Sequence, residues 1–305
     1  EIRPLVKMVR PHVAIITTIA AAHLGHFRNL EEIAAAKAEI FEGVEPGGAA
    51  ILNRDNKQFA FLERRAQEVG VGRIYTFGQH AKADFRLADF EGNAQSSTVW
   101  ATLSGETVEV EIGTPGRHIA ENAMAALGAC TLVGADLGKA VAALAELRPF
   151  KGRGEQHRLG IGEGILTLID ESYNANPASM RAAIALLAAS EPVASGRRIA
   201  VLGDMLEMGE FSAKVHEELA GPILAAGIEH VWLAGAEMAV LRDALPESVH
   251  CEYRSTTEEL RDFAVRAVKP GDVVMVKSSL GIGFGKIVAA LIDNYPAVSE
   301  TERQL

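Results

Sequence analysis

From residue 165 onward the sequence alternates short apolar runs with amphipathic segments, and this rhythm limits the fold more than any other feature. Each apolar run has the length of a strand, and each amphipathic segment has the length of a helix. Such alternation is typical of a mostly parallel sheet with helices on its faces. We predict strands at 165–169, 198–203, 230–234, 249–253 and 272–277, and helices at 178–189, 211–226, 236–244, 257–268 and 284–293.

The first half of the chain is also α/β but is less regular. Between residues 83 and 112, apolar and polar residues alternate without a helical segment, which predicts an antiparallel patch. The other strands are predicted at 13–19, 49–53 and 73–77, and the helices at 2–9, 30–42, 57–69, 119–133 and 137–147. A segment rich in Lys, Arg and Gly follows. We place a domain boundary there, which gives domains at 1–150 and 151–305.

Composition argues against several classes of function. The net charge of -10 disfavours non-specific binding to nucleic acid or to an anionic membrane. The two cysteines, Cys130 and Cys251, form neither a metal-binding spacing nor a disulfide framework, so we expect a cytoplasmic protein. No apolar run approaches the roughly 18 residues of a membrane span. The first residue is Glu1 and not Met, so we expect a piece of a longer chain. We also expect a monomer.

A cluster of polar side chains stands where the strand at 165–169 ends. The stretch reads IDESYNANPASM from residue 169 to 180. In open parallel sheets, ligands bind beyond the carboxyl ends of the strands. Capping by Asn176, with Pro177 in the first helical turn, explains one asparagine but not the run from Asp170 to Asn174. The stretch therefore favours a ligand-binding loop over a purely structural turn.

A lysine interrupts the apolar stripe of the helix predicted after the first strand. At about 100° per residue, Lys37 lies between Ile33 and Phe41. A lysine there either extends its ammonium to solvent or loses its charge, because burial lowers the pKa of an amine. The neutral amine can react with carbon dioxide, and the carbamate formed is an oxygen ligand suited to Mg²⁺. His23 and, less well, His26 lie in the preceding loop and could share that metal.

We find no phosphate-binding loop in the sequence. Such a loop needs G-x-x-x-x-G-K-[ST], and the nearest stretch, LGIGFGKI at 280–287, lacks both the spacing and the hydroxyl residue. It also fails as a dinucleotide fingerprint, because it follows the last strand and has no acidic partner about 20 residues on. We interpret it as a turn, although a helix start of this kind can bind an anion.

Taken together, several stretches resemble the Mur ligases, the ATP-dependent amide-bond ligases of peptidoglycan synthesis. The branch that joins D-alanyl-D-alanine to UDP-N-acetylmuramoyl-tripeptide is the best match. The matching stretches run in the family's order from residue 17 to 279: TTIAAAHLGHF, AAAKAEIFEGVEPGGAAILNRDN, PGRHIAENAMAALGA, KGRGEQHRL, IDESYNANPASM, VLGDMLEMG and MVKSS.

The resemblance implies that residues 1–150 are the second part of a central ATP-binding domain and that 151–305 are a Rossmann-like C-terminal domain. It also implies that the phosphate loop and a Mg²⁺-binding glutamate precede Glu1. We therefore expect this chain to be inactive by itself. ATP and Mg²⁺ are the implied cofactors.

The family's motifs also assign residues in the first domain. His23 matches a Mg²⁺-ligating histidine, and Lys37 matches a carbamylated lysine. Asn122 matches an asparagine that contacts adenine. Where the family often has a second asparagine after its histidine, this chain has Ile119 after His118, which weakens the case for these two as nucleotide ligands.

In the second domain, Arg153 matches a linker arginine that reaches the phosphates of ATP. Asp170 matches an aspartate that contacts the ribose and phosphates, and Tyr173 and Asn174 line the same edge. The resemblance thus implies an interdomain ATP site that closes about a hinge near residue 150. Closure would exclude water from a hydrolysable intermediate.

The peptide substrate is assigned to the ends of two other strands. Lys277 and Ser279 fall where the family holds its peptide, although KSS stands where KGS is commoner. Asp204 and Glu207 lie at another strand end and are expected to help form that cleft. His216 either joins the cleft or stabilises its own helix.

The implied reaction passes through an acyl phosphate, with Lys37, His23 and Arg153 as the residues that carry it. The alternatives are another Mur-type ligase, a folylpolyglutamate synthase, or a non-catalytic module that binds a nucleotide or a peptide. An oxidoreductase is disfavoured, because neither domain has G-x-G-x-x-G after its first strand.

Overall fold

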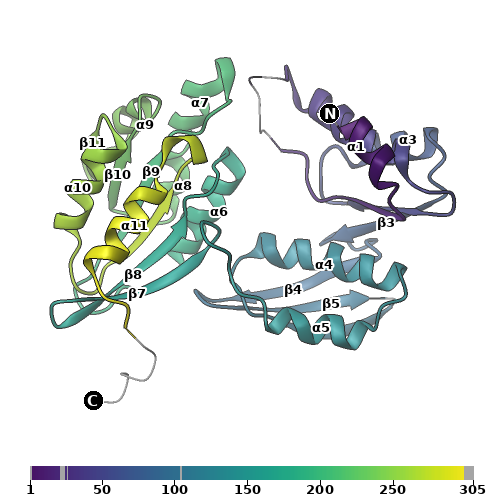
Figure 1. The fold of residues 1–305 in the computed structure, drawn as a ribbon, viewed down its shortest axis with the longest axis horizontal. Helices are drawn as coiled ribbons and strands as arrows, with labels where there is room; N and C mark the ends of the chain where they lie inside the picture. The colour runs from purple at the N-terminus through teal and green to yellow at the C-terminus, as the bar shows by residue number, and fades with distance from the viewer. Residues whose placement is uncertain (1, 21–24, 26, 104, 299–305) are drawn as a thin grey trace. The chain divides into compact units, whose positions relative to one another are not determined.

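The computed structural model describes residues 2–20, 25, 27–103 and 105–298 (Figure 1). The chain divides into two compact units. Unit 1 comprises Glu1–Ala21 and Phe27–Leu147, and unit 2 comprises Ala22–His26 and Arg148–Leu305. Within the described ranges, no helix combines the length and the apolar character that a membrane span requires.

Unit 2 contains a six-stranded sheet in the order β11-β10-β9-β12-β8-β7. Its strands are β7 Glu155–Ile161, β8 Gly164–Glu171, β9 Arg198–Gly203, β10 His230–Ala234, β11 His250–Arg254 and β12 Val273–Lys277. All neighbours are parallel except β7, which pairs antiparallel with β8 at the edge. Because β12 lies between β8 and β9, the order reverses there, and the carboxyl ends of these three strands surround a topological switch point.

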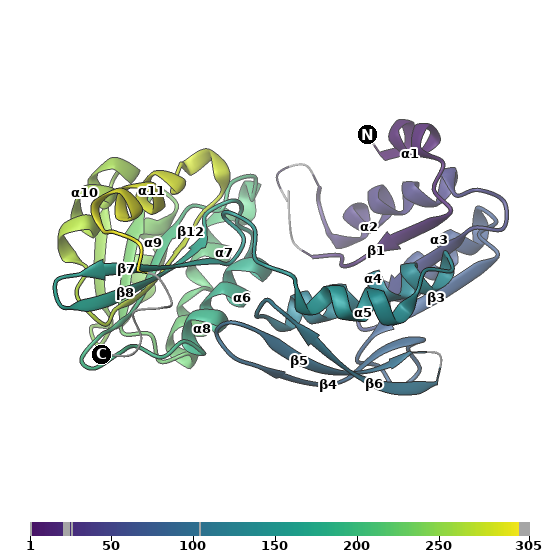
Figure 2. The same ribbon diagram turned by 60° about the horizontal axis from the view of Figure 1, so that its bottom comes forward.

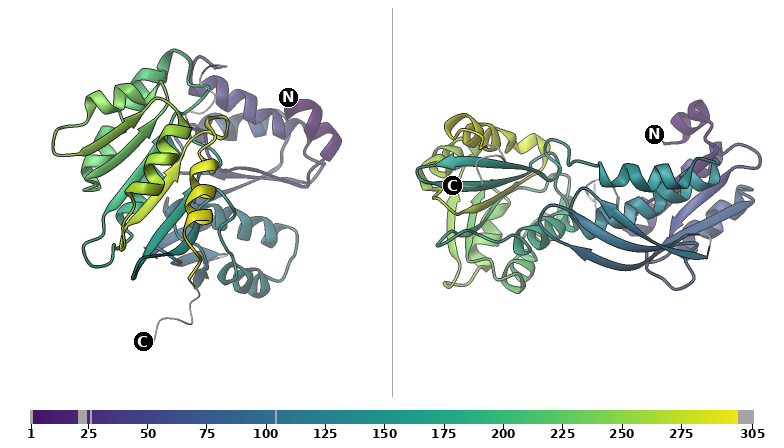
Figure 3. Two further views of the ribbon diagram at one scale, coloured as in Figure 1. Left: turned by 60° about the vertical axis from the view of Figure 1, so that its left-hand side comes forward. Right: turned by 90° about the horizontal axis from the view of Figure 1, so that it is seen from below.

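Helices cover both faces of this sheet (Figures 1 and 3). They are α6 Pro177–Ala188, α7 Ser212–Glu217, α8 Ala220–Ala225, α9 Met238–Ala244, α10 Thr257–Ala267 and α11 Gly285–Asn294. Side chains alternate along each strand, so Ala200 faces the core shared with α6, α8 and α9, whereas Val201 faces the core shared with α10 and α11. This three-layer arrangement confirms the predicted α/β class for the second half of the chain.

Unit 1 also has a six-stranded sheet, in the order β1-β2-β3-β4-β5-β6. The strands are β1 Val13–Ile16, β2 Ala49–Asn53, β3 Arg73–Gly78, β4 Phe85–Gly92, β5 Ser97–Leu103 and β6 Glu106–Ile112. The first four are parallel, and β4, β5 and β6 form the predicted antiparallel patch. Only two residue pairs, Phe77 with Phe85 and Gly78 with Arg86, join β3 to β4.

The helices of unit 1 are α1 Ile2–Val9, α2 Leu30–Ala38, α3 Phe59–Glu68, α4 Arg117–Leu132 and α5 Leu137–Ala145. Figure 2 shows α4 and α5 over one face of the β4–β6 region. Met124 and Leu127 of α4 are buried in one core with residues from β2 to β6, so α4 packs against the parallel and the antiparallel parts of the sheet.

Several elements begin or end at other residues in the structure than the sequence predicts. The strand at 13–19 ends at Ile16, and the helix at 30–42 ends at Ala38, where a short 3₁₀ helix, Glu39–Gly43, takes over. The helix at 211–226 is divided into α7 and α8, because Pro222 has no backbone N–H to continue the hydrogen bonding. Strand β7 was not predicted, since the stretch has no clear alternation and only Leu159 in it is buried.

Candidate functional site

The carboxyl ends of β8, β9 and β12 open into a hollow of about 160 Å³ at the switch point of the unit 2 sheet. Three loops line it, at 174–176, 206–208 and 279–281. Amide, carboxylate and hydroxyl groups line the hollow together with Leu206 and Leu280, which are 40% and 63% exposed. The hollow therefore offers both polar and apolar surface to a small ligand.

Ser279 ties the three loops together. Its hydroxyl accepts a hydrogen bond from the backbone N–H of Leu206 (2.9 Å) and donates to the carbonyl oxygen of Ala175 (3.4 Å). Its own N–H donates to the carbonyl oxygen of Asp204 (3.1 Å). Ser279 is buried, so its predicted place at the substrate cleft is that of a residue beneath the loops.

Asp204 follows β9 and is buried at the start of α9. One of its carboxylate oxygens accepts the backbone N–H of Met238 (3.0 Å). Burial raises the pKa of the Asp204 carboxyl, and hydrogen bonds from the backbone of Glu237 and Met238 offset part of this rise. The carboxyl is thus occupied with holding α9 against the end of β9.

His216 is fully buried on α7 and fixes the loop after Asp204. Its Nε2 accepts the backbone N–H of Met205 (2.9 Å), and its Nδ1 lies 2.7 Å from the carbonyl oxygen of Ser212. Because an N–H can only donate and a carbonyl can only accept, the proton lies on Nδ1 and the ring is neutral. Both ring nitrogens are used, which identifies His216 as a residue that stabilises the loop.

The Asp170 carboxylate joins the turn before β7 to the carboxyl end of β8. It is 1% exposed. One oxygen accepts the backbone N–H and the hydroxyl of Ser172 (3.0 and 2.6 Å), and the other accepts the backbone N–H of Gly152 (3.0 Å). In this arrangement Asp170 holds the 151–153 turn onto the end of its strand.

The exposed side of the same turn carries a cation–π pair. The Arg153 guanidinium lies 4.3 Å from the centre of the Tyr173 ring, and both residues are exposed. Beneath them Lys277 is buried, with its Nζ 3.1 Å from the Glu171 carboxylate and 2.9 Å from the carbonyl oxygen of Asn174. Lys277 thus supports the loop that carries Tyr173.

Asn176 caps α6 as predicted. Its side chain accepts the N–H of Ser179, the Ser179 hydroxyl accepts the N–H of Asn176, and Pro177 is the first helical residue. Asn174 is exposed, and its side-chain oxygen accepts the N–H of Ala175 (2.8 Å). Glu207 lines the hollow with a φ of 63°, one of the described non-glycine residues with a left-handed backbone.

In unit 1, Lys37 is exposed, which agrees with the alternative that its ammonium extends to solvent. The helix ends one residue later, and the buried side chains of α2 are Ile33, Ala34 and Ala38. The Lys37 Nζ nevertheless donates to the carbonyl oxygen of Thr18 (3.1 Å), just beyond β1. Partial desolvation in this position lowers the pKa of its amine.

Two asparagines that the sequence analysis did not single out hold the same segment. Asn53 Nδ2 donates to the carbonyl oxygen of Thr17 (2.9 Å), and Asn56 Nδ2 donates to that of Ile19 (3.0 Å). Together with the hydrogen bond from Lys37 to Thr18, these contacts mean that the carbonyl oxygens of residues 17, 18 and 19 all accept hydrogen bonds from side chains. The sequence feature that indicates this is the polar NRDN stretch, residues 53–56, which begins at the last residue of the 49–53 strand. His23 and His26, which follow this segment, lie outside the described residues.

Asn122 is exposed in the second turn of α4, next to a polar cluster at the ends of β2 and β3. Gln79 Nε2 donates to the Glu121 carboxylate (3.0 Å), and the Gln79 side-chain oxygen accepts from Arg117 (3.2 Å). Burial raises the pKa of the Glu121 carboxyl, and the nearby Asp55 adds to the rise. His118 lies on the same helix, and Ile119 packs against the hydrophobic core.

Two family profiles match the chain. The profile of the Mur ligase middle domain matches residues 1–130, and that of the Mur ligase glutamate ligase domain matches residues 152–280. The UDP-N-acetylmuramoyl-tripeptide–D-alanyl-D-alanine ligases of Rickettsia prowazekii and Escherichia coli are each 31% identical to the chain. These alignments cover 94% and 96% of the chain and 63% of each relative.

Solved structures show the same fold. A crystal structure of MurF from Acinetobacter baumannii superposes with a TM-score of 0.84 at 26% identity, over 96% of this chain and 62% of that one. MurF from Thermotoga maritima has a TM-score of 0.79 at 23% identity, over 96% and 64%. The chain thus spans less than two thirds of the length of each of these proteins.

Proposed function

The chain belongs to the Mur ligase family, and from this we propose that it is part of an ATP-dependent ligase that joins D-alanyl-D-alanine to UDP-N-acetylmuramoyl-tripeptide in peptidoglycan synthesis. The relatives that carry this name are longer than the chain, so the activity is assigned to the complete protein. The observation that supports the proposal most directly is the hollow at the switch point of the unit 2 sheet.

The chemistry of the hollow suits a small dipeptide. D-alanyl-D-alanine carries two methyl groups on a backbone with an amide, an amine and a carboxylate. Leu206 and Leu280 offer apolar surface for the methyl groups, and Asn174 and Asn176 offer amide groups for the backbone. We propose that Lys277, Ser279 and Asp204 serve this substrate by holding the loops that surround it.

The proposed reaction has two steps. A carboxylate oxygen of the tripeptide attacks the γ-phosphorus of ATP, the bond to the ADP oxygen breaks, and an acyl phosphate forms. The dipeptide amine then attacks the acyl carbon, loses a proton, and phosphate leaves. Such steps depend on positioning and charge neutralisation. We propose that Arg153 neutralises phosphate charge and that Asn122 binds adenine.

Asp170 has a supporting part in this scheme. Its carboxylate accepts three hydrogen bonds and thereby holds the turn that carries Arg153. Tyr173 keeps the Arg153 guanidinium over its ring. We propose that Asp170 and Tyr173 together position Arg153 for the triphosphate.

Mg²⁺ is the metal that the family implies. An ammonium cannot bind a cation, so Lys37 can be a Mg²⁺ ligand only as a carbamate. Its lowered pKa favours the neutral amine that carbon dioxide requires, and its exposure gives carbon dioxide access. The donor chemistry therefore fits, with Lys37 and His23 as the proposed ligands. Mg²⁺ bound there would supply positive charge to the phosphates.

The test is a ligation assay on the longest open reading frame that contains this sequence. ADP release in the presence of UDP-N-acetylmuramoyl-tripeptide should require D-alanyl-D-alanine. Turnover with L-glutamate and a folate would instead identify a folylpolyglutamate synthase, and turnover with a single amino acid would identify a sibling ligase. Nucleotide binding with no turnover for any acceptor would leave only a binding module and would overturn the proposal.

A further inference from the structure

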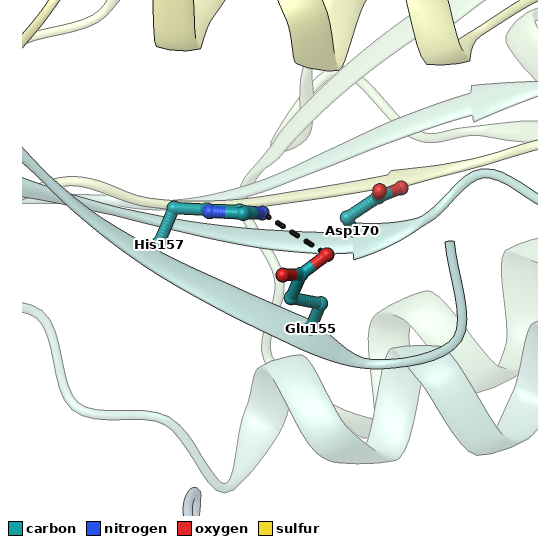
Figure 4. Close-up of side chains that lie close together, drawn as sticks. All are labelled: Glu155, His157 and Asp170. Carbon is teal, nitrogen blue, oxygen red and sulfur yellow. Dashed lines mark ion pairs between the residues drawn. The ribbon is translucent and has the colours of Figure 1, made fainter. Parts of the chain in front are cut away.

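The edge hairpin of unit 2 brings an imidazole and two carboxylates together on one face. Glu155 of β7 and Asp170 of β8 are direct cross-strand partners, and His157 follows Glu155 by two residues. Residues two apart on a strand share a face, so all three side chains leave the hairpin on the same side. Their ligand atoms all lie within 4.8 Å of one another, and Figure 4 shows the His157 ring directed at the Glu155 carboxylate, with Asp170 beside them.

The Nε2 atom of His157 is the unusual member of this cluster. It is shielded from solvent and has no hydrogen-bond partner in the part of the chain that the structure describes. It lies 3.6 Å from a Glu155 carboxylate oxygen, which is too long for a hydrogen bond. Two ligands that bind one tetrahedral Zn²⁺ at about 2.05 Å lie about 3.3 Å apart. The spacing is therefore close to that of two atoms bound to one metal.

The negative charges of this cluster also favour a bound cation. Like charges directly opposite each other on paired strands destabilise a sheet, and Glu155 faces Asp170 in this way. A bound cation removes that repulsion. Asp170 accepts three hydrogen bonds, which leaves one of its roughly four lone-pair positions for a metal. The side chains of Glu155 and His157 are 38% and 23% exposed, so the cluster lies near the surface.

We propose that Glu155, His157 and Asp170 form a site for one divalent transition-metal ion, with Zn²⁺ as the best match. One imidazole nitrogen and two carboxylate oxygens are ordinary Zn²⁺ ligands, whereas Mg²⁺ prefers oxygen ligands alone. The ligands come from two hydrogen-bonded strands, which keeps them in place before the ion arrives. This site is separate from the proposed Mg²⁺ ligands on unit 1, and it shares Asp170 with the turn that carries Arg153.

The experiment measures metal binding by the 305-residue chain after its metals have been removed with a chelator. Calorimetric titration with Zn²⁺ should give one equivalent. Titration with Co²⁺ should give the visible absorption of a low-coordinate nitrogen–oxygen site. His157→Gln and Glu155→Gln should each weaken Zn²⁺ binding by at least about tenfold, because each removes one of three ligands. Zn²⁺ should also raise the melting temperature of the unchanged protein but not of His157→Gln.

The matched control is His250→Gln. His250 stacks on His230 with ring centroids 4.9 Å apart, and this pair is the rival place for a weakly bound metal in the same unit. Binding that survives in His250→Gln but is lost in His157→Gln supports the proposal. Loss of binding in His250→Gln alone, or equal binding by all variants, overturns it. Melting curves without metal separate these outcomes from a folding defect.

Discussion

The Nζ of Lys277 donates a hydrogen bond of 2.9 Å to the carbonyl oxygen of Asn174, at the end of a strand that is buried throughout. The same ammonium pairs with Glu171 at 3.1 Å, and the two side chains are 2% and 17% exposed. A buried cation thus connects β12 to the loop after β8. The loop that lines the hollow is held from below by charge as well as by the helix cap at Asn176.

Removing this cation should destabilise unit 2. Lys277→Met leaves the Glu171 carboxylate without its partner, which costs about 3 kcal/mol for a largely buried pair. Urea unfolding measures the change. Lys286→Met is the control, because Lys286 pairs with Glu258 at the surface, where both side chains are more than half exposed, and little change is expected there. Equal effects of the two substitutions would contradict the structural part assigned to Lys277.

Asp170→Asn should weaken the turn that carries Arg153. Both Asp170 oxygens accept N–H groups, from Ser172 and Gly152. An asparagine offers only one oxygen, so its amide would face a donor, at a cost of about 1–3 kcal/mol. In the complete ligase the Michaelis constant for ATP should rise as well. Ser172→Ala, which removes only the hydroxyl donor, should have the smaller effect on both measurements, and the reverse order would refute this account.

Lys37 should form a carbamate that depends on pH. Protein in ¹³C-labelled bicarbonate should give a carbamate carbon signal by NMR, and the signal should grow as pH rises and the amine loses its proton. Lys37→Met should abolish the signal and, in the complete ligase, the activity. Lys57→Met removes another exposed lysine nearby and should change neither. A carbamate signal that persists in Lys37→Met would exclude this residue.

Asp204 should make the protein less stable as pH rises. Its folded-state pKa is raised by burial above the ordinary value of 3.8. Folded protein therefore binds more protons than unfolded protein between these two values, and stability is lost as pH rises through the folded pKa. The melting temperature of Asp204→Asn relative to the unchanged protein should increase from pH 4 to pH 7.

Asp243 has a pKa shift in the opposite direction and serves as the comparison. Arg242 hydrogen-bonds to its carboxylate and holds the pKa of that carboxyl below its ordinary value. The stability that this pair contributes is present above the ordinary value and is lost as pH falls through the folded pKa. Asp243→Asn should therefore show no increase of the kind expected for Asp204→Asn. A parallel trend in the two variants would show that the pH dependence does not come from Asp204.

The sequence was most informative where local pattern and packing agree. The parallel strands of unit 2 and the antiparallel β4–β6 patch were predicted because each strand has an apolar run or a clean alternation. The cap at Asn176 was predicted from Asn176 and Pro177 alone. These features depend on residues that are close in the chain.

The errors arose where distant residues decide the outcome. The first strand was predicted to reach Ile19, but the carbonyls of Thr17, Thr18 and Ile19 are taken by side chains more than 15 residues away. The helix that carries Lys37 was predicted to continue to residue 42, whereas it ends at Ala38. The hydrogen bonds of Ser279 and Lys277 also join loops that are far apart in the sequence. Periodicity cannot report contacts of this kind.

The short pairing between β3 and β4 affects how unit 1 unfolds. Two residue pairs hold a parallel half-sheet to an antiparallel one, so this is the weakest line in the backbone hydrogen bonding of the sheet. Helix α4 bridges that line with Met124 and Leu127. Shortening either side chain should let the β4–β6 meander exchange its amide hydrogens independently of β1–β3, and the unit would then unfold in two steps instead of one.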